Sequence, residues 1–187
     1  MLRSLSSLLL LVALAGPARA VPAVEATAPA PFHADFEIDP TAYVLSGHSL
    51  HVGLGWRSLR LDLGAYGLAL PAAITNNDAF EVAFHGYGLK LQYFPFAEQR
   101  GGFVGVDTGV NHPLVRRKGT ELASTRTEYS AGVNFGWRFV FAERFYATAW
   151  LGLGYALNGR PVTLGDSTYE GQRLIVFPAV HLGYRFR

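Results

Sequence analysis

The stretch that decides the fold is Tyr129-Ser130-Ala131-Gly132-Val133-Asn134-Phe135-Gly136-Trp137-Arg138-Phe139-Val140-Phe141. Apolar residues occupy every odd position, while most even positions hold glycine or a polar or charged residue. A period of two is the pattern of a β-strand whose faces meet different surroundings. The following stretch, Phe145–Leu157, alternates in the same way, and only Ala142–Arg144 separate the two. The pair is therefore predicted to form a β-hairpin with a tight turn.

The same alternation recurs along the rest of the chain, and no helical period of 3.6 residues competes with it. The expected strands are Phe32–Ile38, His48–Trp56, Leu59–Leu70, Phe80–Phe94, Gly102–His112, Arg126–Phe141, Phe145–Leu157 and Arg173–Phe186. Short connections at Arg57-Ser58, Pro95–Gly101 and Ala142–Arg144 alternate with longer ones. This pattern predicts an all-β protein, an eight-stranded antiparallel up-and-down transmembrane β-barrel with both termini in the periplasm.

Three positions depart from the simple pattern. The first strand is short, and the Asp39-Pro40 pair that follows it favours, as an alternative to the strand, a short helix through Val44. In the fourth strand the apolar residues change face near His85-Gly86, which predicts a bulge. Pro178 in the last strand predicts another bulge or a locally missing ladder bond, because proline has no N–H to donate.

The first twenty residues have the composition of a cleaved export signal. Arg3 precedes the apolar run Leu8–Ala15, and an A-x-A cleavage motif ends at Ala20. The run is too short to span a bilayer as a helix. Residues 21–31, rich in alanine and proline, predict a flexible lead-in, and residues 32–187 are expected to form the barrel. The chain is thus expected in the outer membrane of a Gram-negative cell.

Composition excludes several classes of protein. The chain has no cysteine, so it has no disulfide, no thiolate metal site and no lipoprotein anchor. Its formal net charge is +2, but Arg3 and Arg19 lie in the export signal, and the remaining chain carries 14 basic and 14 acidic residues. That balance gives no support to nucleic-acid binding. The 21 glycines suit the crowded interior of a narrow barrel, where they thin one face of the sheet.

The polar face of the strands is predicted to point into the barrel. A soluble secreted β-barrel carrier, the alternative class, would place more lysine and glutamate and fewer glycines on a wet exterior. Charges inside a narrow barrel must be paired, so the inward set predicts a polar network that leaves no open pore; a proton or ion path is its other interpretation. The predicted network comprises Arg60, Asp62, Lys90, Asp107, Arg138, His181 and Arg185.

The end of the chain carries a family resemblance. The run His181-Leu182-Gly183-Tyr184-Arg185-Phe186 is similar to the C-terminal signal read by the barrel-assembly machinery, although here Arg187 follows the final aromatic residue. With the alternating strands, it makes residues 32–186 resemble the small eight-stranded outer-membrane proteins of the OmpA/OmpX-like superfamily. The resemblance implies contact with outer-membrane lipid, lipopolysaccharide and the assembly machinery. It leaves the role open, because such barrels serve as adhesins, lipid enzymes and inert anchors.

An enzyme is the second functional hypothesis, of the lipid A deacylase or acyltransferase type. Lipid A deacylases of this size use a His-x-Ser pair, whereas Ser49-Leu50-His51 has the reverse order and no carboxylate close in sequence. Gly165-Asp166-Ser167 predicts an ordinary loop turn. His51 and His181 are two lumen-facing histidines without a third ligand. We therefore expect no catalytic residues, metal or cofactor.

One basic stretch, Arg116, Arg117 and Lys118, is predicted to lie outside the membrane, at the level of lipopolysaccharide phosphates. Arginine and lysine bind phosphate well, and a merely solvated loop is the equal alternative. The leading prediction is a non-enzymatic outer-membrane barrel with a structural, adhesive or surface-interaction role, displaying four external connections.

Overall fold

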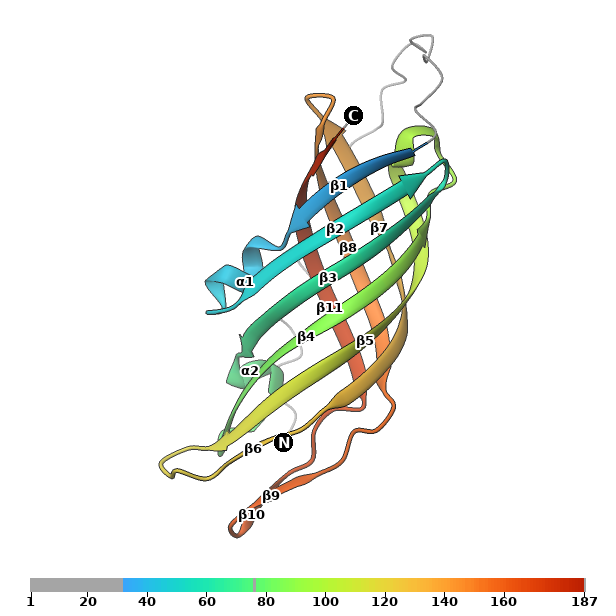
Figure 1. Cartoon of the computed structure of the whole chain (residues 1–187). Coiled ribbons are helices and arrows are strands. Elements are labelled where there is room, and N and C mark those ends of the chain that lie inside the picture. The colour runs from blue at the N-terminus through green and yellow to red at the C-terminus, as the bar shows by residue number, and fades with distance from the viewer. Residues whose placement is uncertain (1–31, 76, 187) are drawn as a thin grey trace, which may run out of the picture.

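The computed structural model describes residues 32–75 and 77–186, and the predicted export signal and lead-in lie outside these ranges. Antiparallel strands make up most of the described chain (Figure 1). The elements are β1 (Phe32–Ile38), α1 (Pro40–Val44), β2 (His48–Trp56), β3 (Leu59–Leu70), α2 (Ala72–Thr75), β4 (Phe80–Tyr93), η1 (Ala97–Gln99), β5 (Gly101–Arg117), β6 (Ala123–Thr125), β7 (Glu128–Phe141), β8 (Phe145–Ala156), β9 (Val162–Leu164), β10 (Ser167–Tyr169) and β11 (Leu174–Arg185).

Eight of the strands close into a barrel. Each of β1, β2, β3, β4, β5, β7, β8 and β11 pairs antiparallel with its two neighbours, and β11 meets β1. The predicted fold class is confirmed, and the predicted strand bounds agree to within two residues except in β5. That strand continues past His112 to Arg117, because Pro113 and Val115 occupy its inward positions and hide the alternation.

The two ends of the barrel differ in their connections. Three short links, including Arg57-Ser58 and Ala142–Arg144, lie at the end where β1 begins and β11 finishes (Figure 1). Ala142 and Glu143 have φ values of 49° and 59°, the left-handed conformation that matches a tight hairpin turn to the twist of its strands. The longer links, which hold α1, α2, β6 and the β9–β10 hairpin, lie at the opposite end. We call these the inner and outer ends.

The strand predicted for the first segment is confirmed, and the helix that was its alternative also forms, after the strand. β1 is a strand, and α1 follows it instead of replacing it. The Asp39 side chain caps α1 by accepting a hydrogen bond from the Thr41 backbone N–H at 2.8 Å, and Pro40 occupies the first turn. No helix among the described residues is long and apolar enough to cross a bilayer.

The bulge predicted at His85-Gly86 is wrong. The pairing of β4 with β3 and with β5 runs through these residues without a skipped position. The even-numbered residues of β4 face inward throughout, and near the outer end they change from polar to apolar, with Phe80 and Val82 buried. These two residues join an apolar cluster with Val115, Val162, Leu164 and Tyr169. In the sequence the apolar residues change face because the surroundings of the inward face change, from the polar network to this apolar cluster.

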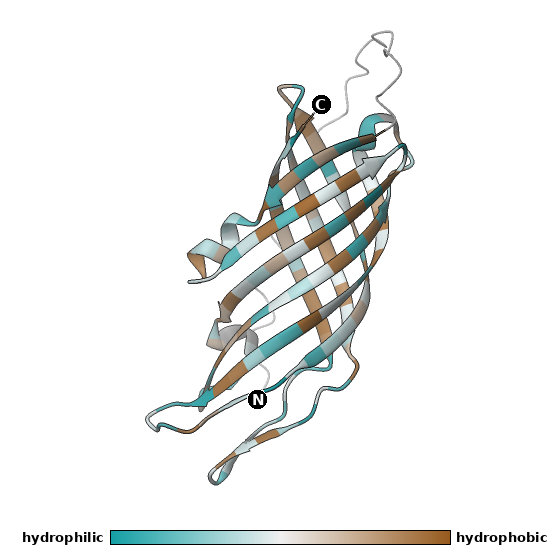
Figure 2. Cartoon of the chain, viewed as in Figure 1, coloured by the Kyte–Doolittle hydropathy of each residue, from teal (hydrophilic) through white to brown (hydrophobic). Residues whose placement is uncertain are grey.

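Apolar side chains cover the outside of the wall, and charged ones lie inside it. Hydropathy alternates residue by residue along the strands (Figure 2). Outward Leu63 is 57 % exposed and outward Val133 is 49 % exposed, whereas inward Arg60 and Arg138 are each 1 % exposed. This is the orientation that lipid requires and the reverse of a soluble barrel with an apolar core.

The seam between β1 and β11 is the shortest in the wall. It runs only from Asp35↔Arg185 to Ile38↔Leu182, while β11 pairs with β8 from Leu174 to Tyr184. Among the described residues, positions 174–181 of β11 therefore have no strand partner on the β1 side, and we call this stretch the unpaired edge.

Pro178 lies in the unpaired edge. The Phe186 N–H donates to Ala34 of β1, and N–H directions alternate along a strand, so even-numbered β11 residues point toward β1. The nitrogen of Pro178, which carries no hydrogen, consequently points to the side without a partner strand. The ladder bond is absent, as one of the two predictions had it, and no bulge interrupts the register with β8.

Candidate functional site: the lumen network

Glu37 is the centre of a buried charge network in the inner half of the barrel. Its carboxylate accepts a hydrogen bond from Arg138 Nη2 at 2.8 Å and contacts His181 Nδ1 at 2.9 Å. Arg60 Nη2 lies 3.4 Å from the same carboxylate. The side chain of Glu37 thus joins β1 to β3, β7 and β11, and it is only 2 % exposed.

Arg60 is the second centre. Its Nη2 donates to Asp35 at 2.6 Å, and its Nη1 donates to Asp62 at 2.9 Å and to Gln92 at 3.0 Å. The planar guanidinium presents several donors in fixed directions, which allows one side chain to bind partners on three strands. Gly53 makes room for this arrangement, since a Cβ there would lie 2.2 Å from Asp35 Oδ1.

Asp62 extends the network toward β2 and β4. It contacts His51 Nδ1 at 2.9 Å, and Lys90 Nζ lies 3.5 Å from its Oδ1. Lys90 also lies 4.4 Å from the centre of the Trp150 ring across the lumen. The rings of His51 and His181 are 4.6 Å apart, each with its Nδ1 at a carboxylate.

Two amides carry the network to Asp107. Gln92 Nε2 donates to Asn134 Oδ1 at 3.3 Å, and Asn134 Nδ2 donates to Asp107 Oδ2 at 2.9 Å. Arg185, by contrast, lies apart at the inner end, where its Nη1 donates to the backbone oxygen of Glu98. Six of the seven predicted residues have a hydrogen bond or ion pair to the network observed in the structure. Among the described residues, Arg185 has none.

Sequence reasoning missed the two carboxylates that matter most, Asp35 and Glu37. Alternation in the first strand did place them with His33 on one face, which was the available signal. Their short strand gave no indication that the cations of distant strands converge on them.

The network spans the lumen in the inner half of the barrel. Its members come from all eight barrel strands, and the ion pairs join three cations to three carboxylates. The strand contributions are Asp35 and Glu37 (β1), His51 (β2), Arg60 and Asp62 (β3), Lys90 and Gln92 (β4), Asp107 (β5), Asn134 and Arg138 (β7), Thr148 (β8) and His181 (β11). Below it, Phe94, Phe103 and Tyr146 are at most 3 % exposed, so side chains also fill the inner end.

The residues considered for catalysis do not form a nucleophile and base. No carboxylate lies close to His51 in sequence, but Asp62 of the neighbouring strand reaches it. The Ser49 hydroxyl, however, accepts a hydrogen bond from the Asp39 N–H at 3.1 Å and has no hydrogen bond to His51. The described residues contain no group of three or more potential metal ligands.

The outer-end candidates have structural partners. Gly165-Asp166 forms the turn of the β9–β10 hairpin, and the Ser167 hydroxyl donates to Asp166 at 3.0 Å. Arg117 Nη1 lies 2.6 Å from the Asp166 carboxylate, so this arginine ties the hairpin to β5. Both the hydrogen bond and the ion pair lower the pKa of Asp166. Arg116 and Lys118 remain exposed.

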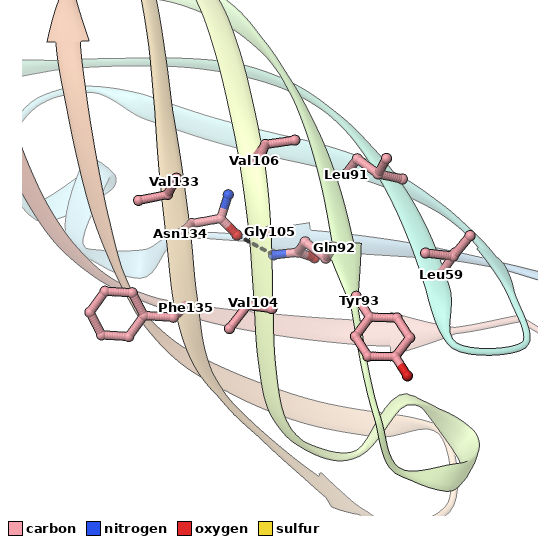
Figure 3. A pocket seen from close by; sticks show the side chains of 10 residues that line it. All are labelled: Leu59, Leu91, Gln92, Tyr93, Val104, Gly105, Val106, Val133, Asn134 and Phe135. Atoms are coloured by element: carbon pink, nitrogen blue, oxygen red, sulfur yellow. Dashed lines mark hydrogen bonds between the residues drawn. The ribbon is translucent and has the colours of Figure 1, made fainter.

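A shallow hollow of about 460 Å³ lies on the lipid-facing wall over β4, β5 and β7 (Figure 3). Apolar side chains such as Leu91, Val106 and Phe135 border it, and the Gln92–Asn134 hydrogen bond lies behind them. Its lining matches the rest of the apolar belt, so the hollow belongs to the surface that lipid chains cover.

Comparison with known proteins places the fold. Neisserial surface protein A is similar over 83 % of this chain and 96 % of its own, with a TM-score of 0.50 and 14 % identity. The chain has the fold of the small outer-membrane β-barrels. The N-terminal β-barrel domain of Pseudomonas aeruginosa OprF matches over the same shares, with a TM-score of 0.49 and 14 % identity. No protein-family model matches the sequence, and no curated protein matches it either.

Proposed function

We propose that the chain is a non-conducting, non-enzymatic outer-membrane barrel whose role is surface interaction through its outer end. The observation that carries the proposal is the pairing of an apolar outer wall with an ion-paired network across the lumen. Lipid is the environment in which the wall is stable, and the network blocks diffusion through the centre. The outer end is the part available to molecules outside the cell.

The outer end is ordered by its own contacts. The β9–β10 hairpin packs on Phe80, Val82 and Val115, which belong to the inner faces of β4 and β5. The Arg117–Asp166 ion pair holds its turn, and a second ion pair joins Arg126 to Glu128 at 2.5 Å. Ordered connections favour recognition, because a partner that binds them does not have to immobilise a flexible loop.

The exposed cations Arg116 and Lys118 suit an anionic surface. They lie at and just beyond the end of β5, where lipopolysaccharide phosphates surround a barrel of this orientation. Phosphate is a strong acceptor for both side chains. We propose lipopolysaccharide as a partner at this position, with the barrel-assembly machinery as a transient partner during insertion.

Fractionation and gel mobility test the location. The protein is expected in the outer-membrane fraction, and an unheated sample is expected to migrate differently from a heated one. Recovery from the periplasm without detergent would contradict the proposal. In planar bilayers the purified protein is expected to give no steady conductance, and a steady open channel would contradict the closed lumen.

The proposed partner is tested with Arg116→Gln/Lys118→Gln. This double variant is expected to bind purified lipopolysaccharide more weakly than the parent protein in a detergent-based binding assay. Arg100→Gln, at an exposed position of the inner end, is the matched control and is expected to bind as the parent does. Equal binding by all three proteins would refute the role of the basic stretch.

A further inference from the structure

The unpaired edge lies at the depth of the lipid belt. Its outward residues Val176 and Val180 are 57 % and 49 % exposed. The edge lies between the aromatic residue Tyr184 at the inner end and the Leu174↔Tyr155 pair at the outer end. Backbone N–H and C=O groups without partners are tolerated at this depth only where protein or water covers them. The edge is therefore a place where the apolar wall is interrupted by hydrogen-bonding groups.

Pro178 makes the edge a poor site for another strand. It stands in the middle of the unpaired stretch with its missing N–H on the open side, and proline on an edge blocks strand addition. A second copy of the chain, which would cover the edge by strand pairing, is thus disfavoured. Helix α1 contacts β11 without supplying a strand.

Trp150 lies directly behind the edge. It pairs in register with Ala179, and its ring is 5.9 Å from Phe177 and 5.4 Å from His181. The indole Nε1 is buried and has no acceptor within the described residues. Lys90 Nζ lies 4.4 Å from the centre of the same ring. Two hydrogen-bond donors therefore lie close together just inside the interruption.

The apolar cluster that includes Phe80 and Val115 fills one side of the outer half of the lumen, and the side near the unpaired edge is less completely filled. Inward Tyr66, Trp150 and Phe177 are half-buried, whereas the inward residues of the network below them are buried. At Gly154, a Cβ would meet only ordinary contacts, 3.6 Å from Ala131 O and 3.7 Å from Ile175 Cβ. The inner face of β8 beside the edge thus has room for at least a methyl group.

We propose that the unpaired edge is a lateral portal for a single-chain amphiphile, whose polar head enters the outer half of the lumen while its alkyl chain stays in the bilayer. The head group is one with acceptor oxygens, such as a carboxylate, because Trp150 Nε1 and Lys90 Nζ are donors. Its own oxygens and accompanying water pair with the backbone groups of the edge, and Phe177 contacts the first carbons of the chain. This inference rests on the membrane location proposed above.

The test uses Trp150 as the reporter. In Trp56→Phe/Trp137→Phe, Trp150 is the one tryptophan left, because the chain has three. The variant is placed in phospholipid nanodiscs and titrated with a fatty acid that carries bromine next to its carboxylate, a quencher of indole fluorescence at contact. Saturable quenching that an unbrominated fatty acid reverses is the expected result. Quenching that is absent, or that no competitor reverses, overturns the proposal.

Two further variants make the test specific. Gly154→Leu fills the space beside the edge and is expected to weaken the saturable quenching by roughly tenfold or more, equivalent to the loss of one well-fitted contact group. Leu153→Ala, on the lipid side of the same strand, is expected to leave it unchanged. Heat-dependent gel mobility confirms that each variant is a folded barrel, which separates a failure of the portal from a failure of the membrane assignment. Equal quenching in all three proteins, or a stable dimer with the edge covered, also overturns it.

Discussion

Replacing Arg60 by methionine tests the lumen network. Methionine has a similar length but no charge, and the change removes the donors that bind Asp35, Asp62 and Gln92. Asp35 is left with His33 at 4.0 Å as its remaining ion-pair partner, and its side chain is fully buried. Removing one partner of a buried ion pair typically costs about 3–5 kcal/mol, because the other charge is left uncompensated. The free energy of unfolding is expected to fall by that amount.

Urea unfolding of the refolded protein in micelles, followed by tryptophan fluorescence, measures this loss. Arg100→Gln is the control, since it breaks an exposed ion pair with Glu98 that is worth about 0–1 kcal/mol. Arg60→Met/Asp35→Asn is expected to recover part of the stability, because the uncompensated carboxylate is gone. A loss for Arg60→Met no larger than that of the control would refute the reasoning and indicate a lumen in which water solvates the charges.

Three further predictions test the wall, its packing and the outer end. Val133→Arg is expected to lower the free energy of unfolding in a bilayer by about 2–4 kcal/mol, measured by urea titration, because the position faces lipid; no loss would place it in water. Gly136→Ala is expected to cost about 1–3 kcal/mol in the same assay, because its Cβ would lie 2.3 Å from Ala149 O, while Gly154→Ala should be nearly neutral; equal effects would contradict this packing. Asp166→Asn is expected to speed amide hydrogen exchange in β10 at neutral pH. The Ser167 hydrogen bond and Arg117 lower the pKa of Asp166, so its stabilising effect is complete at neutral pH and is lost as the pH falls through the lowered pKa; the variant and parent should then exchange alike.

The wall of the barrel was predictable because the period of two is a local property. Strands such as β7 carry their own evidence in every residue, and the short turns fix how consecutive strands pair. The glycines on the charged face predicted that this face points into the barrel, and in the structure it does.

The contents of the lumen were less predictable because they depend on residues far apart in the chain. Phe80 and Val82 lie on the inward face of β4. They can be apolar there because the β9–β10 hairpin, some eighty positions later, packs on them. The sequence around His85 contains no trace of that hairpin, so a bulge was inferred instead. The length of the β1–β11 seam was equally hidden, because alternation in two strands does not say how many of their residues meet.

Glu37 also constrains the order in which the barrel can assemble. It meets Arg138 across 101 positions and His181 across 144, so neither contact exists until the first strand has met the last. Bringing such distant segments together is slow compared with forming a hairpin. An unclosed sheet that entered the bilayer would carry Arg60 and Arg138 without their carboxylates. Ring closure and burial of these cations therefore have to coincide, and the last strand to be synthesised completes both.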